Sequence, residues 1–120
     1  MKALLALSVL LLAAGTALAH ESRGPHGGRQ VDAGAMHVEL ITKGPTVEVY
    51  VSDGAGKPVD ASGYKGLAIL VVGGKPARIP LAPAGGDKLT GTAATDLGAS
   101  VKGAVQITTN AGATAQGKFD

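Results

Sequence analysis

The stretch Met36–Asp53, MHVELITKGPTVEVYVSD, alternates apolar and polar residues on both sides of Gly44-Pro45. Apolar residues at every second position give a strand one buried and one solvent-facing side, so this stretch predicts a β-hairpin. A two-residue connection sets a register in which inward residues face inward partners. The pairs expected from it are Lys43 with Thr46, Leu40 with Val49, and Val38 with Val51. The same register places His37 and Glu39 on the outer face of the hairpin, near Ser52 and Tyr50.

Further strands are expected from the apolar runs downstream of this hairpin. Gly66–Val72, GLAILVV, is a continuous apolar run bounded by glycines, which indicates a central strand rather than a helix. Ala77–Leu81 returns from it after a Gly-Gly turn. Pro80 has no N–H to donate to a ladder and therefore indicates a sheet edge. Shorter strands are expected at Arg29–Asp32, Ala104–Thr109 and Ala113–Phe119.

Short strands separated by turns rich in glycine and proline predict an all-β fold. The expected architecture is a single antiparallel immunoglobulin-like β-sandwich of about seven or eight short strands. A small open barrel is the nearest alternative. This domain is expected to span residues 29–120, preceded by a flexible polar arm over residues 20–28, HESRGPHGG.

The first 19 residues have the features of a cleaved secretory signal peptide. Lys2 supplies the positive start, Ala3–Ala14 is apolar, and Ala17-Leu18-Ala19 is a small-x-small cleavage signal. The apolar run is too short to cross a bilayer core, which takes roughly 20 residues. We therefore expect an exported product that begins at His20 and is not inserted in the membrane.

The composition excludes several classes of function. The chain has no cysteine, so it has neither disulfides nor thiolate metal ligands, and its formal net charge is only +2. The basic residues are scattered and aromatic residues are scarce, which argues against a nucleic-acid partner. There is no nucleophile elbow, phosphate loop, dinucleotide fingerprint or paired-carboxylate signal. We therefore expect a non-enzymatic protein.

The histidines are the residues most suited to a specific chemistry. The three in the chain, His20, His26 and His37, all lie near the start of the exported product. A free α-amine beside the His20 imidazole would form a chelate, and nitrogen ligands suit copper, nickel and zinc. Glu39, two residues after His37, is either an oxygen ligand or a hydrogen-bond partner that orients an imidazole. The alternative is that the histidines are ordinary solvated residues, and Met36 is expected in the core.

Part of the chain resembles a known family. The run from Gly24 to Val59, GPHGGRQVDAGAMHVELITKGPTVEVYVSDGAGKPV, is similar to the start of the small N-terminal β-domain of periplasmic adaptor subunits of heavy-metal efflux pumps. The positions that carry the resemblance are Gly24, Pro25, Gly27, Gly28, Arg29, Gly34, Glu39, Leu40, Val49, Tyr50, Asp53, Gly56, Lys57 and Pro58. The segment Asp87–Gly91 is similar to a later part of the same domain. The resemblance implies a stand-alone periplasmic β-domain associated with metal resistance.

The sequence also departs from that family. The adaptors continue into lipoyl-like, helical-hairpin and barrel domains, which this sequence does not contain. They also tend to carry an acidic-Pro-His stretch, where this chain has Asp96–Ser100 with no histidine. A metal role attached to that stretch therefore does not transfer.

Two hypotheses from different classes follow. The first is a periplasmic, non-enzymatic protein of heavy-metal handling or efflux that binds a transition metal ion, with copper and zinc the leading candidates beside nickel and cobalt. Its ligands would be His20, His26 and His37 with Glu39, and its protein partner would belong to an efflux system or the cell envelope. The second is a structural or interaction module without a metal site, which docks through an exposed edge such as the strand that carries Pro80.

Overall fold

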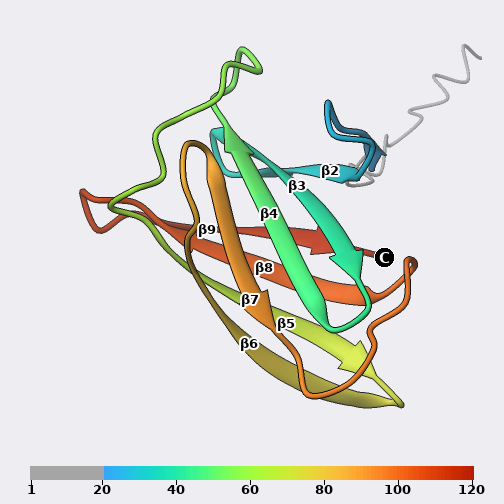
Figure 1. The fold of residues 1–120 in the computed structure, drawn as a ribbon. Coiled ribbons are helices and arrows are strands. Elements are labelled where there is room, and N and C mark those ends of the chain that lie inside the picture. Colours follow the sequence, from blue (N-terminus) through green and yellow to red (C-terminus); the bar gives the residue numbers. More distant parts are fainter. Residues whose placement is uncertain (1–20) are drawn as a thin grey trace, which may run out of the picture.

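A computed structural model describes residues 21–120, and every regular element in this range is a β-strand (Figure 1). Within the range, no helix is present that could cross a bilayer. The strands are β1 (Ser22–Arg23), β2 (Arg29–Ala33), β3 (Met36–Lys43), β4 (Thr46–Ser52), β5 (Lys65–Val72), β6 (Lys75–Pro83), β7 (Lys88–Thr92), β8 (Lys102–Thr108) and β9 (Thr114–Phe119). The cleavage signal and His20 lie outside the described residues.

The nine strands form one antiparallel sheet in the order β1-β2-β3-β4-β7-β6-β5-β8-β9. The sheet is curled like half a barrel, so that β3, β4 and β7 lie across β5, β8 and β9 (Figure 1). Strand β2 packs against β9 where the two ends of the sheet approach each other. The all-β antiparallel prediction is confirmed. A sandwich of seven or eight strands is not confirmed, because β6 links both halves into one sheet: its body pairs with β5 and its end with β7.

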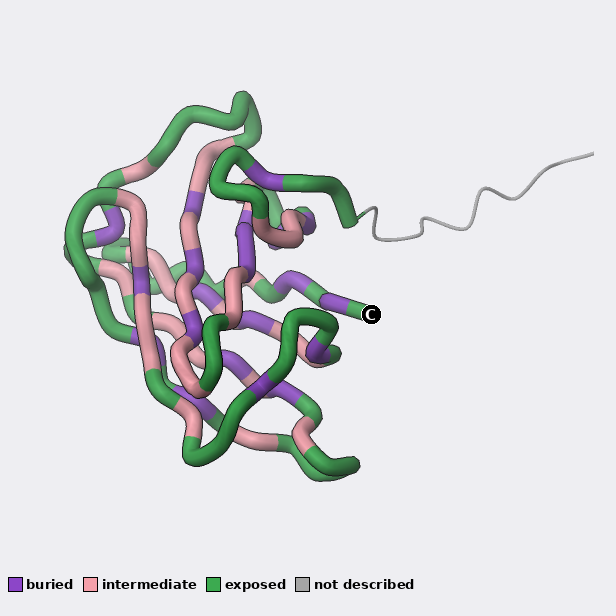
Figure 2. Tube along the Cα trace, turned by 45° about the vertical axis from the view of Figure 1, so that its right-hand side comes forward, coloured by how far each residue is buried: buried purple, intermediate pink, exposed green. Residues whose placement is uncertain are grey.

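The predicted hairpin is present as β3 and β4, and its register is confirmed. Leu40 lies opposite Val49 and Val38 opposite Val51, with Lys43 and Thr46 closing the ladder. Gly44 in the connection has a φ of 55°, in the left-handed region that favours glycine. Along β4 the buried residues Val47, Val49 and Val51 alternate with half-buried ones, whereas Val38, Glu39 and Leu40 of β3 are all buried (Figure 2).

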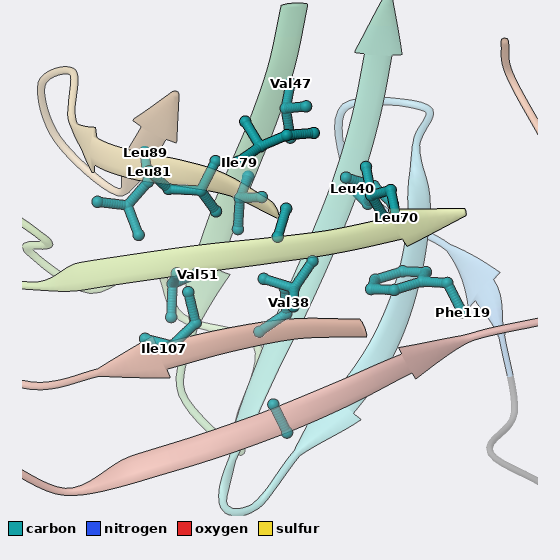
Figure 3. Close-up of a cluster of buried hydrophobic side chains, with 14 of the residues drawn as sticks. Val38, Leu40, Val47, Val51, Leu70, Ile79, Leu81, Leu89, Ile107 and Phe119 are labelled. Carbon is teal, nitrogen blue, oxygen red and sulfur yellow. The ribbon is translucent and has the colours of Figure 1, made fainter. Parts of the chain in front are cut away.

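The core fills the inside of the curled sheet (Figure 3). Val38, Leu40, Val47 and Val51 of the hairpin face Leu70, Ile107 and Phe119 from the other half, with Ile79, Leu81 and Leu89 completing the cluster. Strand β5 is an interior strand, paired with β6 and β8, but it is not at the centre of the sheet and it is buried on one face only. Ala68 and Leu70 point into the core, whereas the alternate residues Leu67, Ile69 and Val71 face outward.

The position of Pro80 follows from the curl of the sheet. Strand β6 is not a terminal strand, since it lies between β5 and β7. Its ladder with β7, however, contains only Ala82 and Pro83, so the stretch up to Leu81 is paired with β5 alone. Pro80 therefore lies where β6 has no partner strand on the β7 side. Proline is tolerated there, because no neighbouring strand on that side needs its N–H.

Candidate functional site

Residues 21–28 lie against the sheet and form a compact turn. Strand β1 pairs with β2, with Ser22 opposite Gln30 and Arg23 opposite Arg29. The chain then turns tightly, because the Gly24 N–H donates to the Gly28 carbonyl (2.9 Å) and the Gly27 N–H donates to the Gly24 carbonyl (3.0 Å). This turn brings the backbone of residues 24–28 over the outer face of β3.

Glu39 is the anchor for this turn. Its side chain is on the outer face of β3, as predicted from the alternation, yet it is only 2% exposed because residues 24–28 cover it. Its Oε2 accepts the backbone N–H of His26 (2.9 Å) and of Gly28 (2.8 Å), and its Oε1 contacts His26 Nδ1 at 2.7 Å. A buried carboxylate needs hydrogen-bond donors to offset the loss of its hydration. Within residues 21–120 every buried side-chain nitrogen or oxygen has a hydrogen-bond partner.

The close approach of the turn to β3 depends on glycine. A Cβ built on Gly24 would lie 2.2 Å from the Glu39 side chain. A Cβ on Gly28 would lie 2.5 Å from the Ile41 side chain and 2.7 Å from the Leu40 carbonyl oxygen. A larger residue at either position would therefore push the turn away from the carboxylate.

The His26 ring is fixed on two sides. It stacks on Tyr50 with ring centroids 3.7 Å apart and an interplanar angle of 12°. An ionised carboxylate can only accept, so the 2.7 Å contact places a hydrogen on His26 Nδ1. In the neutral ring the free lone pair is then on Nε2, which has no hydrogen-bond partner among residues 21–120. The His26 side chain as a whole is 40% exposed, so part of the ring is open to solvent.

A cavity of about 290 Å³ opens beside this ring. Its wall is more apolar than polar: Pro25, Val51, Gly56 and Pro58 line it together with His26, Gln30, Glu39, Tyr50, Ser52 and Asp87. Lys88 lies at the same face, with its Nζ 5.9 Å from the Tyr50 ring centroid and 3.3 Å from a Glu48 carboxylate oxygen. The cavity therefore combines a largely apolar wall with a few polar side chains beside the His26 ring.

His37 lies on the same outer face, but its neighbours differ from those of His26. It is opposite Asp32 in the β2–β3 ladder, and its Nε2 is 3.6 Å from the Asp32 carboxylate. Its Nδ1 is 3.2 Å from the amide nitrogen of Gln30. Among residues 21–120, no group of three or more histidine, cysteine, aspartate or glutamate side chains is arranged to hold one metal ion. The structure thus joins His26 to Glu39, and places His37 with Asp32 and Gln30 instead.

Two of these residues were not singled out from the sequence as site residues. Asp32 belongs to a predicted strand next to the hairpin, so pairing that strand with β3 would have placed it beside His37. Tyr50 was expected near Glu39 from the hairpin register, and the two are indeed opposite each other. Its stacking on His26 depends on the fold of the turn and had no signal in the sequence.

Arg29 and Asp53, two further positions of the motif, support the fold. Arg29 donates to the carbonyls of Val101 and Asp120, and its guanidinium lies 5.5 Å from the Phe119 ring centroid. It also pairs with Glu21, and this hydrogen bond holds the pKa of the Glu21 carboxyl below its usual value. In the next turn Asp53 Oδ1 accepts the N–H groups of residues 55 and 57, each at 2.9 Å.

Comparison of the chain with protein families, with curated proteins and with solved structures found no match.

Proposed function

We propose that this chain is a periplasmic, non-enzymatic protein that binds a transition metal ion, Cu(II) or Zn(II) foremost, and takes part in heavy-metal handling or efflux. The observation that supports it is the His26–Glu39 contact of 2.7 Å at Nδ1. Metal-binding histidines commonly donate their second ring N–H to a carboxylate, which fixes the tautomer and the ring orientation. His26 has such a carboxylate partner at Nδ1, and its side chain is 40% exposed.

The proposed ligands are the imidazoles of His20, His26 and His37. We assign Glu39 the role of orienting His26 and not that of a ligand, because its two oxygens already receive three N–H contacts. Asp32 is added as an oxygen donor beside His37, since its carboxylate is 3.6 Å from His37 Nε2. The ion would bridge the arm, which Glu39 already holds on the sheet, and the strand that carries His37, as expected for an open carrier site rather than a closed structural one.

His20 enters the proposal from its place in the sequence, next to Glu21. The β1–β2 register pairs Ser22 with Gln30, so a ladder continued by two residues on metal binding would bring position 20 opposite Asp32. Asp32 is itself the ladder partner of His37. Neighbours across a ladder lie about 4.5–5.5 Å apart at Cβ, which is close enough for side chains to share one ion. The α-amine of a chain that starts at His20 would add another nitrogen.

The test is titration of the chain from residue 20 to 120 with Cu(II) and with Zn(II), followed by calorimetry and, for copper, by electron paramagnetic resonance. We expect His26→Gln and His37→Gln each to lower the affinity at least about 10-fold and to remove nitrogen couplings from the copper spectrum. Gln116→Ala, an outward-facing change on β9, is the control and should bind as the wild type does.

Glu39→Gln is the sharper variant, because it separates orientation from packing. The amide can accept the two backbone N–H groups and donate to His26 Nδ1, which moves the ring hydrogen to Nε2 and removes the proposed ligand lone pair. We expect metal affinity to fall about 10–100-fold while the turn at residues 24–28 stays in place. Copper binding that is unchanged in all three variants, or no tighter than that of the isolated peptide 20–37, would refute the proposal.

A structural or interaction module without a metal site is the second candidate. It is favoured by the fact that His26 and Glu39 satisfy each other inside the fold without any ion. Docking by strand addition to the open stretch of β6 is disfavoured, since Pro76 and Pro80 both lie on it and cannot donate to an added strand. The titrations above separate the two candidates.

A further inference from the structure

The outer face of the β6-β5-β8-β9 half of the sheet carries an apolar stripe. Ala68 and Leu70 of β5 point into the core, so Leu67, Ile69 and Val71 line the opposite face. Val71 is 48% exposed, and no other large hydrophobic residue among residues 21–120 is as exposed. A row of three apolar side chains on an uncovered sheet face has no role in the core of this fold.

Basic residues flank the stripe on both sides. Arg78 is the ladder partner of Ile69 on one side, and Ala104 followed by Lys118 continues the same row on the other. Lys102 is opposite Val71, and Lys65 starts the stripe on β5. All four basic side chains are on exposed residues. We refer to Leu67, Ile69 and Val71 with Lys65, Arg78, Lys102 and Lys118 as the basic face.

Acidic residues are excluded from these strands. None of β5, β6, β8 and β9 contains an aspartate or a glutamate, and Asp120 comes only after the end of β9. The outer face of the other half is mixed in charge, with Asp32, Glu39 and Glu48 on it. Asp120 lies at the end of this face, where it lines a pocket together with Ile69, Val71, Lys102 and Lys118. The four basic residues still give the face an excess of positive charge, although the formal net charge of the chain is only +2.

We infer that the basic face docks on the surface of an anionic lipid bilayer. Its excess of positive charge matches anionic headgroups, and each lysine or arginine near such a surface strengthens binding roughly 5-fold. A second copy of the chain, face to face, would oppose four cations to four cations. Protein interfaces are enriched in aromatic residues and depleted in lysine, whereas this face has no aromatic side chain and three lysines. An exported protein with this face would lie flat on the membrane, with the His26 side of the sheet away from it.

The experiment is co-sedimentation of the chain from residue 20 to 120 with vesicles, at an ionic strength of about 0.05 M where screening is weak. Vesicles of equal parts phosphatidylglycerol and phosphatidylcholine are compared with pure phosphatidylcholine. The test variant is Lys102→Glu with Lys118→Glu. The matched control is Lys43→Glu with Lys57→Glu, which changes the net charge by the same amount on exposed residues of the other half. Val71→Ser tests the apolar stripe.

We expect the wild type to bind anionic vesicles and not neutral ones, with binding that weakens as salt is raised. Lys102→Glu with Lys118→Glu should lower the affinity for anionic vesicles at least about 30-fold. The control pair should change this affinity far less. Val71→Ser should weaken binding without changing its salt dependence. Urea unfolding of each variant shows whether it is folded, and Lys65→Gln with Arg78→Gln is a milder second pair.

The inference is overturned if the wild type does not sediment with the anionic vesicles or binds neutral ones equally well. It is also overturned if the test pair and the control pair lose the same affinity. Binding to soluble polyglutamate without binding to vesicles would replace the bilayer by an acidic protein partner. None of these results depends on metal binding, so failure here and failure of the proposed function can be told apart.

Discussion

Glu39→Ala removes the carboxylate that holds the turn at residues 24–28 on the sheet. The side chain is 2% exposed and receives two backbone N–H groups and one ring N–H at 2.7–2.9 Å. The substitution leaves the donors of His26 and Gly28 without an acceptor. It also leaves a space between the turn and β3 that the neighbouring glycines cannot fill.

The size of the effect follows from these contacts. A hydrogen bond to a charged group contributes about 1.5–3 kcal/mol, so three would sum to roughly 5–9 kcal/mol if the donors stayed buried. The turn can instead lift into water and recover its hydrogen bonds there, which limits the loss to the free energy that docks it. We expect the free energy of unfolding to fall by about 2–4 kcal/mol. For a domain of about 100 residues this lowers Tm by on the order of 15 °C.

The assay is urea unfolding followed by far-ultraviolet circular dichroism, together with hydrogen exchange of the His26 and Gly28 amides. Glu48→Ala is the matched control, because Glu48 is a glutamate on the neighbouring strand whose partners are Lys43 and Lys88 at 3.8 and 3.3 Å. Glu48 is 14% exposed, but Lys43 and Lys88 are 69% and 31% exposed, so solvent screens both pairs and they contribute about 1 kcal/mol or less. The control should therefore stay within about 1 kcal/mol of the wild type and keep the amides of the turn protected.

The reasoning is refuted if Glu39→Ala costs no more than Glu48→Ala. It is also refuted if the two amides exchange as slowly in Glu39→Ala as in the wild type, because they would then have found another acceptor. A large loss of stability with unchanged exchange would place the role of Glu39 in packing rather than in hydrogen bonding.

Three further predictions concern the same framework. Gly28→Ala should destabilise the fold by about 1–3 kcal/mol in urea unfolding, since its Cβ would lie 2.5 Å from the Ile41 side chain; a stability equal to the wild type would contradict the close packing. Leu70→Ala should cost about 2–5 kcal/mol by the same measurement, because Leu70 is fully buried in the core. The Arg29 hydrogen bond keeps the pKa of Glu21 below its usual value, so this contact stabilises the fold above the usual carboxyl range, and its contribution disappears as the pH falls through the lowered pKa. Glu21→Gln should therefore flatten the acid side of the stability–pH curve, and an unchanged curve would count against the contact.

The sequence alone determined the all-β class and the register of the β3–β4 hairpin. Both follow from local rules: alternation with a period of two, and a short connection at Gly44-Pro45 that leaves one register with the apolar sides together. The same alternation placed His37 and Glu39 on the outer face, where the structure has them. The prediction of a strand at Gly66–Val72 was also correct, and this strand is paired on both sides.

Tertiary structure alone decided how these strands close and what covers Glu39. Nothing local in β6 indicates that it pairs with both β5 and β7, which turns an expected sandwich into one curled sheet. The burial of Glu39 depends on a turn that lies 11 to 13 residues earlier in the chain. Alternation reports which side a residue faces, but a face is buried or exposed only through the segments that pack on it, and those contacts are not local in sequence.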